Sequence, residues 1–443
     1  MKNTLALFSA LLITAVAGAQ TNPVITGWMQ NTTNIKGRHY VNGNSTPIND
    51  NVLANVQSVK YSTNSVYIAT NGIPAYITGP FLDGNPSLAT SQAAIFKFPL
   101  NPVQNTGTPS PTTMGNIGIF INGVALFDYR DGVSWQSSSS SLKGGPLGGT
   151  GDGIWNRDAV VAERAGFDCV KGHPAMGNYH HHQNPSAFKL DLNVVSTICN
   201  LYDADGLYVI DSTKHAPLIG FAYDGFPIYG AYAYKNVDGT GGIVRMKSSY
   251  TLRNITTRAS GPNVNANYPL GYFREDYQYN ATSANTPDYL DEHNGRFCVT
   301  PEYPNGIYCY FATVDEKWNS AYPYAVGPTF YGVKSAAKVN SITEAVTTYT
   351  PSTTSVFNLN EGLNMVVFPN PSSEFIAVQT NGIIRNDMQV NLYDMNGKLL
   401  ERKTLHQGST IAYFDVRLLY SGNYVVEITD GTQRITKKIV LTK

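Results

Sequence analysis

The stretch GNYHHHQNP (residues 177–185) brings together three of the eight histidines of this 443-residue chain. Side chains of a β-strand alternate between its two faces, so His180 and His182 would share one face and leave His181 on the other. Two imidazoles on one face, two residues apart, are a common half-site for Zn or Cu. We therefore predict that His180 and His182 are the central ligands of a site for a divalent transition metal.

A metal site of this kind needs a further ligand, and two other histidines are candidates. His173 is the better one, because a tight turn at residues 174–177 would fold it back beside the strand that carries His180. His215 is the second, since it opens the apolar stretch HAPLIG. Asp224 sits in an Asp-Gly turn, where it could be a carboxylate ligand or could orient a ligating imidazole.

Three functional hypotheses follow from these residues. The first is a module that binds a metal or a small ligand. The second is a metal-dependent, hydrolase-like enzyme in which Glu163 or Asp224 acts as a general base on water. The third is a structural or adhesive protein whose histidines only form hydrogen bonds. For His181, on the opposite face, a structural or surface role is favoured. The chain has no GxSxG or HExxH motif, which argues against two common hydrolase types.

The four cysteines suggest two disulfides, because disulfides persist in the oxidising compartments that exported proteins reach. The stretch CVTPEYPNGIYC, from Cys298 to Cys309, indicates a strand, a turn and a second strand, so its ends could meet across a hairpin. We therefore expect a Cys298–Cys309 bond and, by elimination, a Cys169–Cys199 bond. Four buried, reduced thiols are the alternative.

The first 19 residues are typical of a secretory signal peptide, with Lys2, an apolar stretch and a small-residue cleavage site in that order. The apolar stretch is shorter than the roughly 18 residues of a transmembrane helix, and no later stretch reaches that length. Charged residues make up 14% of the chain and its net charge is zero, which argues against nucleic-acid binding and a polybasic membrane patch. We expect an exported protein, secreted or attached to a surface, with no transmembrane segment.

Apolar and polar residues often alternate with a period of two, as at residues 56–80, which predicts a mainly β fold. The clearest short helix is AVVAERAGF (159–167), which Asn156 or Asp158 could cap. The expected organisation is a lead segment (20–50), a large β-rich domain with one or two short helices (51–335), a Thr/Ser-rich linker (336–364) and a small C-terminal β-sandwich (365–443).

The C-terminal unit resembles the type A sorting domain of the type IX secretion system of Bacteroidetes. The matching residues are Phe368-Pro369-Asn370-Pro371, Leu392-Tyr393-Asp394, Asn396-Gly397, Leu418, Gly422-Asn423-Tyr424 and Lys437-Lys438-Ile439-Val440. The resemblance implies handling by the type IX secretion machinery, removal of the domain, and release or anchoring at the outer cell surface. A carbohydrate-binding or adhesive sandwich is the alternative.

The large domain resembles the YHYH domain family, named for a Tyr-His-Tyr-His motif that aligns with residues 179–182. Further matches are Asp168-Cys169, Gly172-His173-Pro174, His215–Gly220, Asp224–Gly230, Leu290-Asp291-Glu292, Asn294-Gly295-Arg296 and Thr300–Pro304. One position departs from the motif, because His181 stands where the family has its second Tyr. The resemblance implies a site around this motif but no particular reaction, since the family has no characterised activity.

Overall fold

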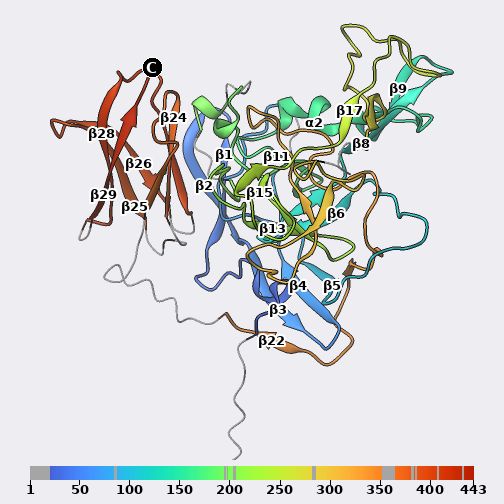
Figure 1. The fold of residues 1–443 in the computed structure, drawn as a ribbon, viewed down its shortest axis with the longest axis horizontal. Helices are drawn as coiled ribbons and strands as arrows, with labels where there is room; N and C mark the ends of the chain where they lie inside the picture. The colour runs from blue at the N-terminus through green and yellow to red at the C-terminus, as the bar shows by residue number, and fades with distance from the viewer. Residues whose placement is uncertain are drawn as a thin grey trace, which may run out of the picture.

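The computed structural model shows a mainly β protein, as predicted, in which short strands are joined by many turns (Figure 1). The structure describes residues 20–83, 87–193, 196, 198–202, 206–281, 286–351, 365–380, 384, 387–406, 409–431 and 434–443. The predicted signal peptide, residues 1–19, lies outside them. Within the described residues the α-helices are α1 (Pro23–Thr26) and α2 (Ala159–Ala162). Neither helix is long and apolar enough to cross a membrane.

A mixed eight-stranded sheet forms the centre of the large domain. Its spatial order is β11 (Gly172–Ala175), β12 (Asn178–His181), β7 (Ala125–Phe127), β6 (Asn116–Phe120), β13 (Leu218–Ala222), β14 (Pro227–Tyr229), β20 (Ile307–Phe311) and β19 (Gly295–Cys298). The pairs β12–β7 and β14–β20 are parallel, and the other pairs are antiparallel. β13 is buried along its whole length, in keeping with its central place and its apolar sequence.

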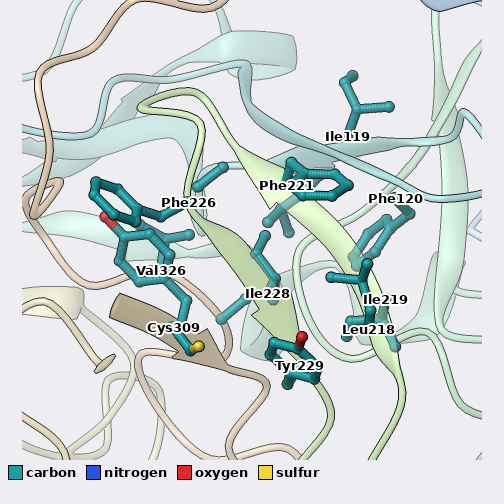
Figure 2. Packing of buried hydrophobic residues seen from close by; sticks show 14 of the residues in the cluster. Ile119, Phe120, Leu218, Ile219, Phe221, Phe226, Ile228, Tyr229, Cys309 and Val326 are labelled. Carbon is teal, nitrogen blue, oxygen red and sulfur yellow. The ribbon is translucent and has the colours of Figure 1, made fainter. Parts of the chain in front are cut away.

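An antiparallel five-stranded sheet shares its core with the eight-stranded one. Its order is β21 (Ala337–Val339), β5 (Ala94–Pro99), β4 (Ser65–Thr70), β3 (Val56–Tyr61) and β22 (Thr347–Tyr349). In β5, Ala94, Phe96 and Phe98 are buried while the alternate residues are half-buried, as a period of two requires. These side chains belong to the same apolar cluster as Phe221 and Ile228, shown in Figure 2. Burial of this shared core holds the two sheets together.

The segment expected to be a linker, residues 336–364, begins with two of these strands. β21 pairs with β5 and β22 pairs with β3. The rest of the segment, from residue 352 onward, lies outside the described residues. Threonine packs well on a pleated surface, and an edge strand is held by backbone hydrogen bonds whatever its side chains. The ordered β structure therefore extends further along the chain than its composition indicates.

Smaller elements surround the two large sheets. The small sheets are β1 (Lys36–Val41) with β2 (Asn44–Leu53), β10 (Asn156–Asp158) with β8 (Arg130–Gln136) and β9 (Ser141–Gly144), β15 (Tyr232–Tyr234) with β16 (Ile243–Arg245), and β17 (Tyr250–Leu252) with β18 (Tyr277–Tyr279). The 3-10 helices described are Gly145–Leu147, Arg164–Gly166, Phe188–Leu190, Ile198–Asn200 and Arg274–Asp276. The helix predicted over 159–167 is shorter than expected. α2 begins after Asp158, whose side chain accepts a hydrogen bond from Val160 N–H, and a 3-10 turn follows it.

The C-terminal unit is a β-sandwich, as predicted (red in Figure 1). One sheet has β23 (Met365–Phe368), β24 (Phe375–Thr380) and β27 (Ile411–Asp415), and the other has β26 (Leu399–Leu405), β25 (Met388–Asp394), β28 (Gly422–Thr429) and β29 (Arg434–Leu441). Val390 lies opposite Ile428 and Leu392 opposite Val426 on neighbouring strands, and all four are buried. These cross-strand pairs form part of the core between the two sheets.

Candidate metal centre

One β-hairpin carries His173 and His180. Its strands β11 and β12 pair antiparallel with His173 directly opposite His180, so both side chains leave the same face of the sheet. The chain reverses at Met176 and Gly177, which both have positive φ, a conformation that costs glycine little. The hairpin thus contains the tight turn that was expected to return His173 to the strand.

The Nε2 atoms of three imidazoles converge. His182 Nε2 lies 3.1 Å from His180 Nε2 and 3.4 Å from His173 Nε2. Among the described residues, these three side chains form the group whose ligand atoms all lie within 4.8 Å of one another. Nitrogens bound to one Zn ion at about 2.0–2.1 Å in a tetrahedron are roughly 3.3 Å apart. The spacing of the Nε2 atoms therefore fits a shared metal ion.

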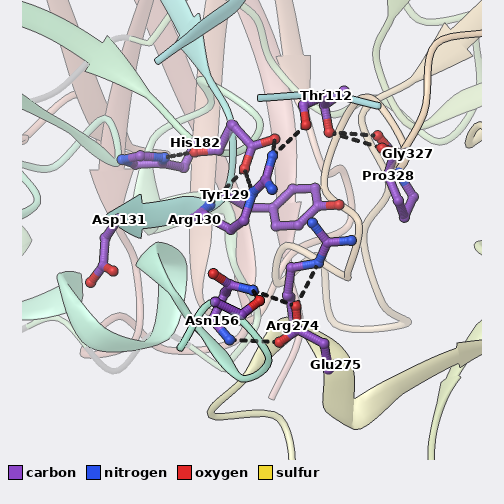
Figure 3. Close-up of polar contacts among 12 residues, drawn as sticks. Thr112, Tyr129, Arg130, Asp131, Asn156, His182, Arg274, Glu275, Gly327 and Pro328 are labelled. Carbon is purple, nitrogen blue, oxygen red and sulfur yellow. Dashed lines mark hydrogen bonds and ion pairs between the residues drawn. The ribbon is translucent and has the colours of Figure 1, made fainter. Parts of the chain in front are cut away.

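Backbone carbonyls fix the orientation of two of the rings. His180 Nδ1 lies 2.9 Å from the carbonyl oxygen of Asn178, and His182 Nδ1 lies 2.6 Å from that of Asp128, a contact drawn in Figure 3. A carbonyl oxygen can only accept, so each Nδ1 carries a proton, and a ring that is neutral then presents an unprotonated Nε2. Metal-ligating histidines are oriented in this way.

Glu163 adds a carboxylate to the cluster. Its Oε2 lies 3.3 Å from both His173 Nε2 and His182 Nε2, yet it is buried without a well-aligned hydrogen-bond donor. Burial raises the pKa of Glu163, but the contacts with these two imidazoles outweigh burial and hold that pKa well below its usual range. Burial alone would lower the pKa of His182. The nearby Glu163 carboxylate has the opposite effect and outweighs burial, so the pKa of His182 is raised. The sequence marked Glu163 only as a candidate general base, because nothing in its spacing from the histidines indicates a ligand.

Aromatic rings line the cluster. Phe127 stacks on His180, with ring centroids 3.9 Å apart and planes at 19°, and Phe167 meets His173 edge-on at 4.9 Å. Burial, followed by the neighbouring imidazoles, holds the pKa of His180 well below its usual range, so that ring stays neutral. The Glu163 side chain is 24% exposed, whereas the His173 and His182 side chains are 8% and 3% exposed and His180 is buried. The cluster therefore reaches water on the Glu163 side.

His181 points to the opposite face, as the strand period predicts. Its Nε2 lies 2.7 Å from the hydroxyl of Tyr76, and burial lowers its pKa to about 3. The neighbouring Tyr179 donates a hydrogen bond to Asp168, which also accepts from backbone N–H groups. His181 and Tyr179 thus hold the hairpin against the core, a structural role.

Two predicted site residues lie apart from this cluster. His215 Nδ1 contacts the carbonyl of Ala216, and the His215 ring packs against two tyrosines. Asp224 is fully buried and accepts hydrogen bonds from Tyr310 Oη and from the backbone N–H of Gly332. The structure therefore places neither residue among the converging ligand atoms, and Asp224 holds loops in place.

The cysteines differ in part from expectation. Cys169 and Cys199 form a disulfide, whereas Cys298 and Cys309 are buried free thiols. The predicted hairpin is present, but its register places Cys298 opposite Ile307 and Cys309 opposite Arg296. The thiols are thus diagonal neighbours, and Cα atoms in diagonal positions are roughly 7–8 Å apart, beyond ordinary disulfide geometry. The Cys298–Cys309 bond was therefore predicted wrongly.

Together these features define a β-rich protein with a buried histidine centre and an appended C-terminal β-sandwich. A family model described as YHYH protein matches residues 95–323, and one described as a secretion system C-terminal sorting domain matches residues 366–442. The chain belongs to the YHYH protein family and carries such a sorting domain. The sorting domain indicates a protein that is secreted or located at the outer cell surface.

Comparison with curated proteins found no match. Among solved structures, the chain is similar to a DUF3244 family protein with an immunoglobulin-like β-sandwich fold from Bacteroides vulgatus. The identity is 16% and the TM-score 0.16, over 17% of this chain and 82% of the other. A likeness of this size supports no conclusion about function.

Proposed function

We propose that this protein is a secreted or outer-surface protein whose YHYH domain binds a divalent transition metal, Zn or Cu, through His173, His180 and His182. The observation that carries the proposal is the convergence of three buried Nε2 atoms. Imidazole nitrogens suit both metals, and a carboxylate oxygen from Glu163 would supply a fourth ligand.

A structural or adhesive role explains the same geometry less well. Histidines that only hold loops together pair their N–H groups with acceptors. Here Glu163 Oε2 is buried without a well-aligned hydrogen-bond donor. His180 Nε2 and His182 Nε2 also face each other while both Nδ1 protons are directed at carbonyls. A cation at this point would be bound by the Nε2 lone pairs of the neutral rings and by the carboxylate.

Elemental analysis of the full-length protein, purified without chelator, tests the proposal. We expect roughly one Zn or Cu ion per chain, because the donor atoms converge on one point. His180→Ala should abolish that binding. His215→Ala is the matched control and should retain the metal, since His215 lies outside the cluster. A wild-type protein that stays metal-free after incubation with both ions contradicts the proposal.

A second candidate is a metal-dependent, hydrolase-like enzyme, which the partial exposure of Glu163 favours. Three histidines would then hold the metal, and Glu163 would act as a general base toward a water molecule. Glu163→Gln separates the two roles. If Glu163 is a ligand, metal affinity falls by about tenfold or more. If it is a base, affinity is kept and hydrolysis of activated esters such as p-nitrophenyl acetate falls by about 10²–10⁴.

A further inference from the structure

A second buried polar cluster, separate from the histidine centre, surrounds Lys171. Its Nζ lies 2.9 Å from Asp191 Oδ1, 3.1 Å from Ser186 Oγ and 3.3 Å from Asn184 Oδ1. Lys171, Asn184 and Ser186 are 0% exposed and Asp191 is 3% exposed. A lysine is almost never buried to this extent unless it is paired, as Lys171 is with Asp191. An amine, an amide and a carboxylate are therefore confined together without bulk water.

The hydrogen bonds of the Asn184 side chain make its carbonyl carbon, Cγ, more open to attack by a nucleophile. Its Oδ1 accepts from the backbone N–H of Ser186 at 3.2 Å and from the hydroxyl of the same residue, in addition to Lys171. Its Nδ2 donates to Ser320 Oγ at 2.9 Å. Donors aimed at a carbonyl oxygen stabilise the negative charge that develops there when a nucleophile attacks the carbon.

We infer that Lys171 and Asn184 are joined by an intramolecular isopeptide bond, formed with the help of Asp191. Asp191 accepts a proton from Lys171 Nζ, and the neutral amine attacks Asn184 Cγ, one bond beyond the oxygen that it contacts. The new Nζ–Cγ bond forms and the Cγ–Nδ2 bond breaks. The departing Nδ2 takes up the protons released from Nζ and leaves as ammonium, so no oxidant or reductant is needed. Because the fold holds the amine and the amide side by side, they need not meet by diffusion, and the reaction is accelerated.

The position of this bond gives it a structural consequence. Lys171 directly precedes β11 and Asn184 follows shortly after β12, so the bond closes the open end of the hairpin. That hairpin carries His173 and His180. A covalent link at its base would keep the strands paired and the imidazoles in place whether or not a metal is bound.

Peptide mass mapping of the wild-type, full-length protein tests the inference. After reduction and denaturation, trypsin would cut an unmodified chain after Arg164, Lys171 and Lys189. With Lys171 in an amide, we expect one uncut peptide, residues 165–189, that is lighter than its sequence mass by about 17 Da, the mass of ammonia. Cleavage after Lys171 into peptides of unmodified mass would overturn the inference.

Two variants assign the roles. Asp191→Asn keeps both reacting side chains but removes the proton acceptor, so its peptides should be cut after Lys171 and have their sequence masses. Asp211→Asn is the matched control, because Asp211 contacts the exposed Lys214, and it should keep the bond. A 17 Da loss that persists in Asp191→Asn contradicts the role of Asp191. A wild-type loss of about 18 Da that links Lys171 to Asp191 instead contradicts the role of Asn184.

Discussion

His180 and His182 face each other through their Nε2 atoms, 3.1 Å apart, while the Nδ1 of each ring is directed at a backbone carbonyl. The two carbonyls decide the tautomer, because they can bond only to a protonated Nδ1. When both rings are neutral, as metal ligands are, their Nε2 lone pairs converge on one point of a buried site. This relationship, more than the number of histidines, makes the cluster a candidate metal centre.

Removal of the metal is expected to destabilise the protein. A ligand that binds only the folded state, at about 100 times its dissociation constant, stabilises it by about 2.7 kcal/mol. EDTA should therefore lower the Tm of the metal-loaded protein by several degrees in differential scanning fluorimetry. His180→Ala should show no such change, and an equal response in the two proteins would mean that the chelator acts elsewhere.

Substitution of His181 should affect stability but not metal content. His181→Phe keeps a flat ring in the buried space and removes the hydrogen bond with Tyr76, which costs about 1 kcal/mol. Urea unfolding should show this loss, while elemental analysis should show the wild-type amount of metal. Loss of the metal in this variant would mean that the face opposite His180 also supports binding.

The disulfide between Cys169 and Cys199 should make a measurable contribution to stability. It spans 30 residues of the chain, and the loop-entropy relation predicts about 3–4 kcal/mol for a loop of that length. The double variant Cys169→Ser/Cys199→Ser should lose this amount in urea unfolding. Thiol titration of the denatured, unreduced wild type should detect Cys298 and Cys309, and the absence of free thiols would show that these two are oxidised after all.

The stability contributed by Asp224 should depend on pH. Burial raises the pKa of Asp224 to about 6 from an ordinary value of 3.8. The folded state thus holds a proton that the unfolded state loses first, and stability should fall as pH rises from about 4 to about 6, then level off. Asp224→Asn should flatten this part of the profile, since it cannot ionise. The measurement is the unfolding free energy of both proteins from pH 4 to 7. Parallel profiles would show that folding does not raise the pKa of Asp224.

The pairing of His180 with His182 could be predicted from the sequence, because a strand places alternate residues on one face. The return of His173 followed from a short turn, which is local in sequence. Glu163 could not be recognised as part of the set, since α2 and the turn after it are brought to the hairpin only by tertiary packing. The position of His215 also depends on tertiary packing. Its apolar neighbours suggested a strand, but they gave no information on how far His215 lies from the cluster.

The sequence by itself determined the β-rich fold, the sandwich at the C-terminus and the division of His180 and His182 from His181, because these depend on side-chain periodicity and short turns. Tertiary structure alone decided which groups meet. The diagonal register left Cys298 and Cys309 as neighbouring free thiols without a disulfide. The carbonyl of Asp128, far from His182 in the chain, set the orientation of that ring. Contacts between distant segments depend on how sheets pack and pair, and a linear pattern does not contain that information.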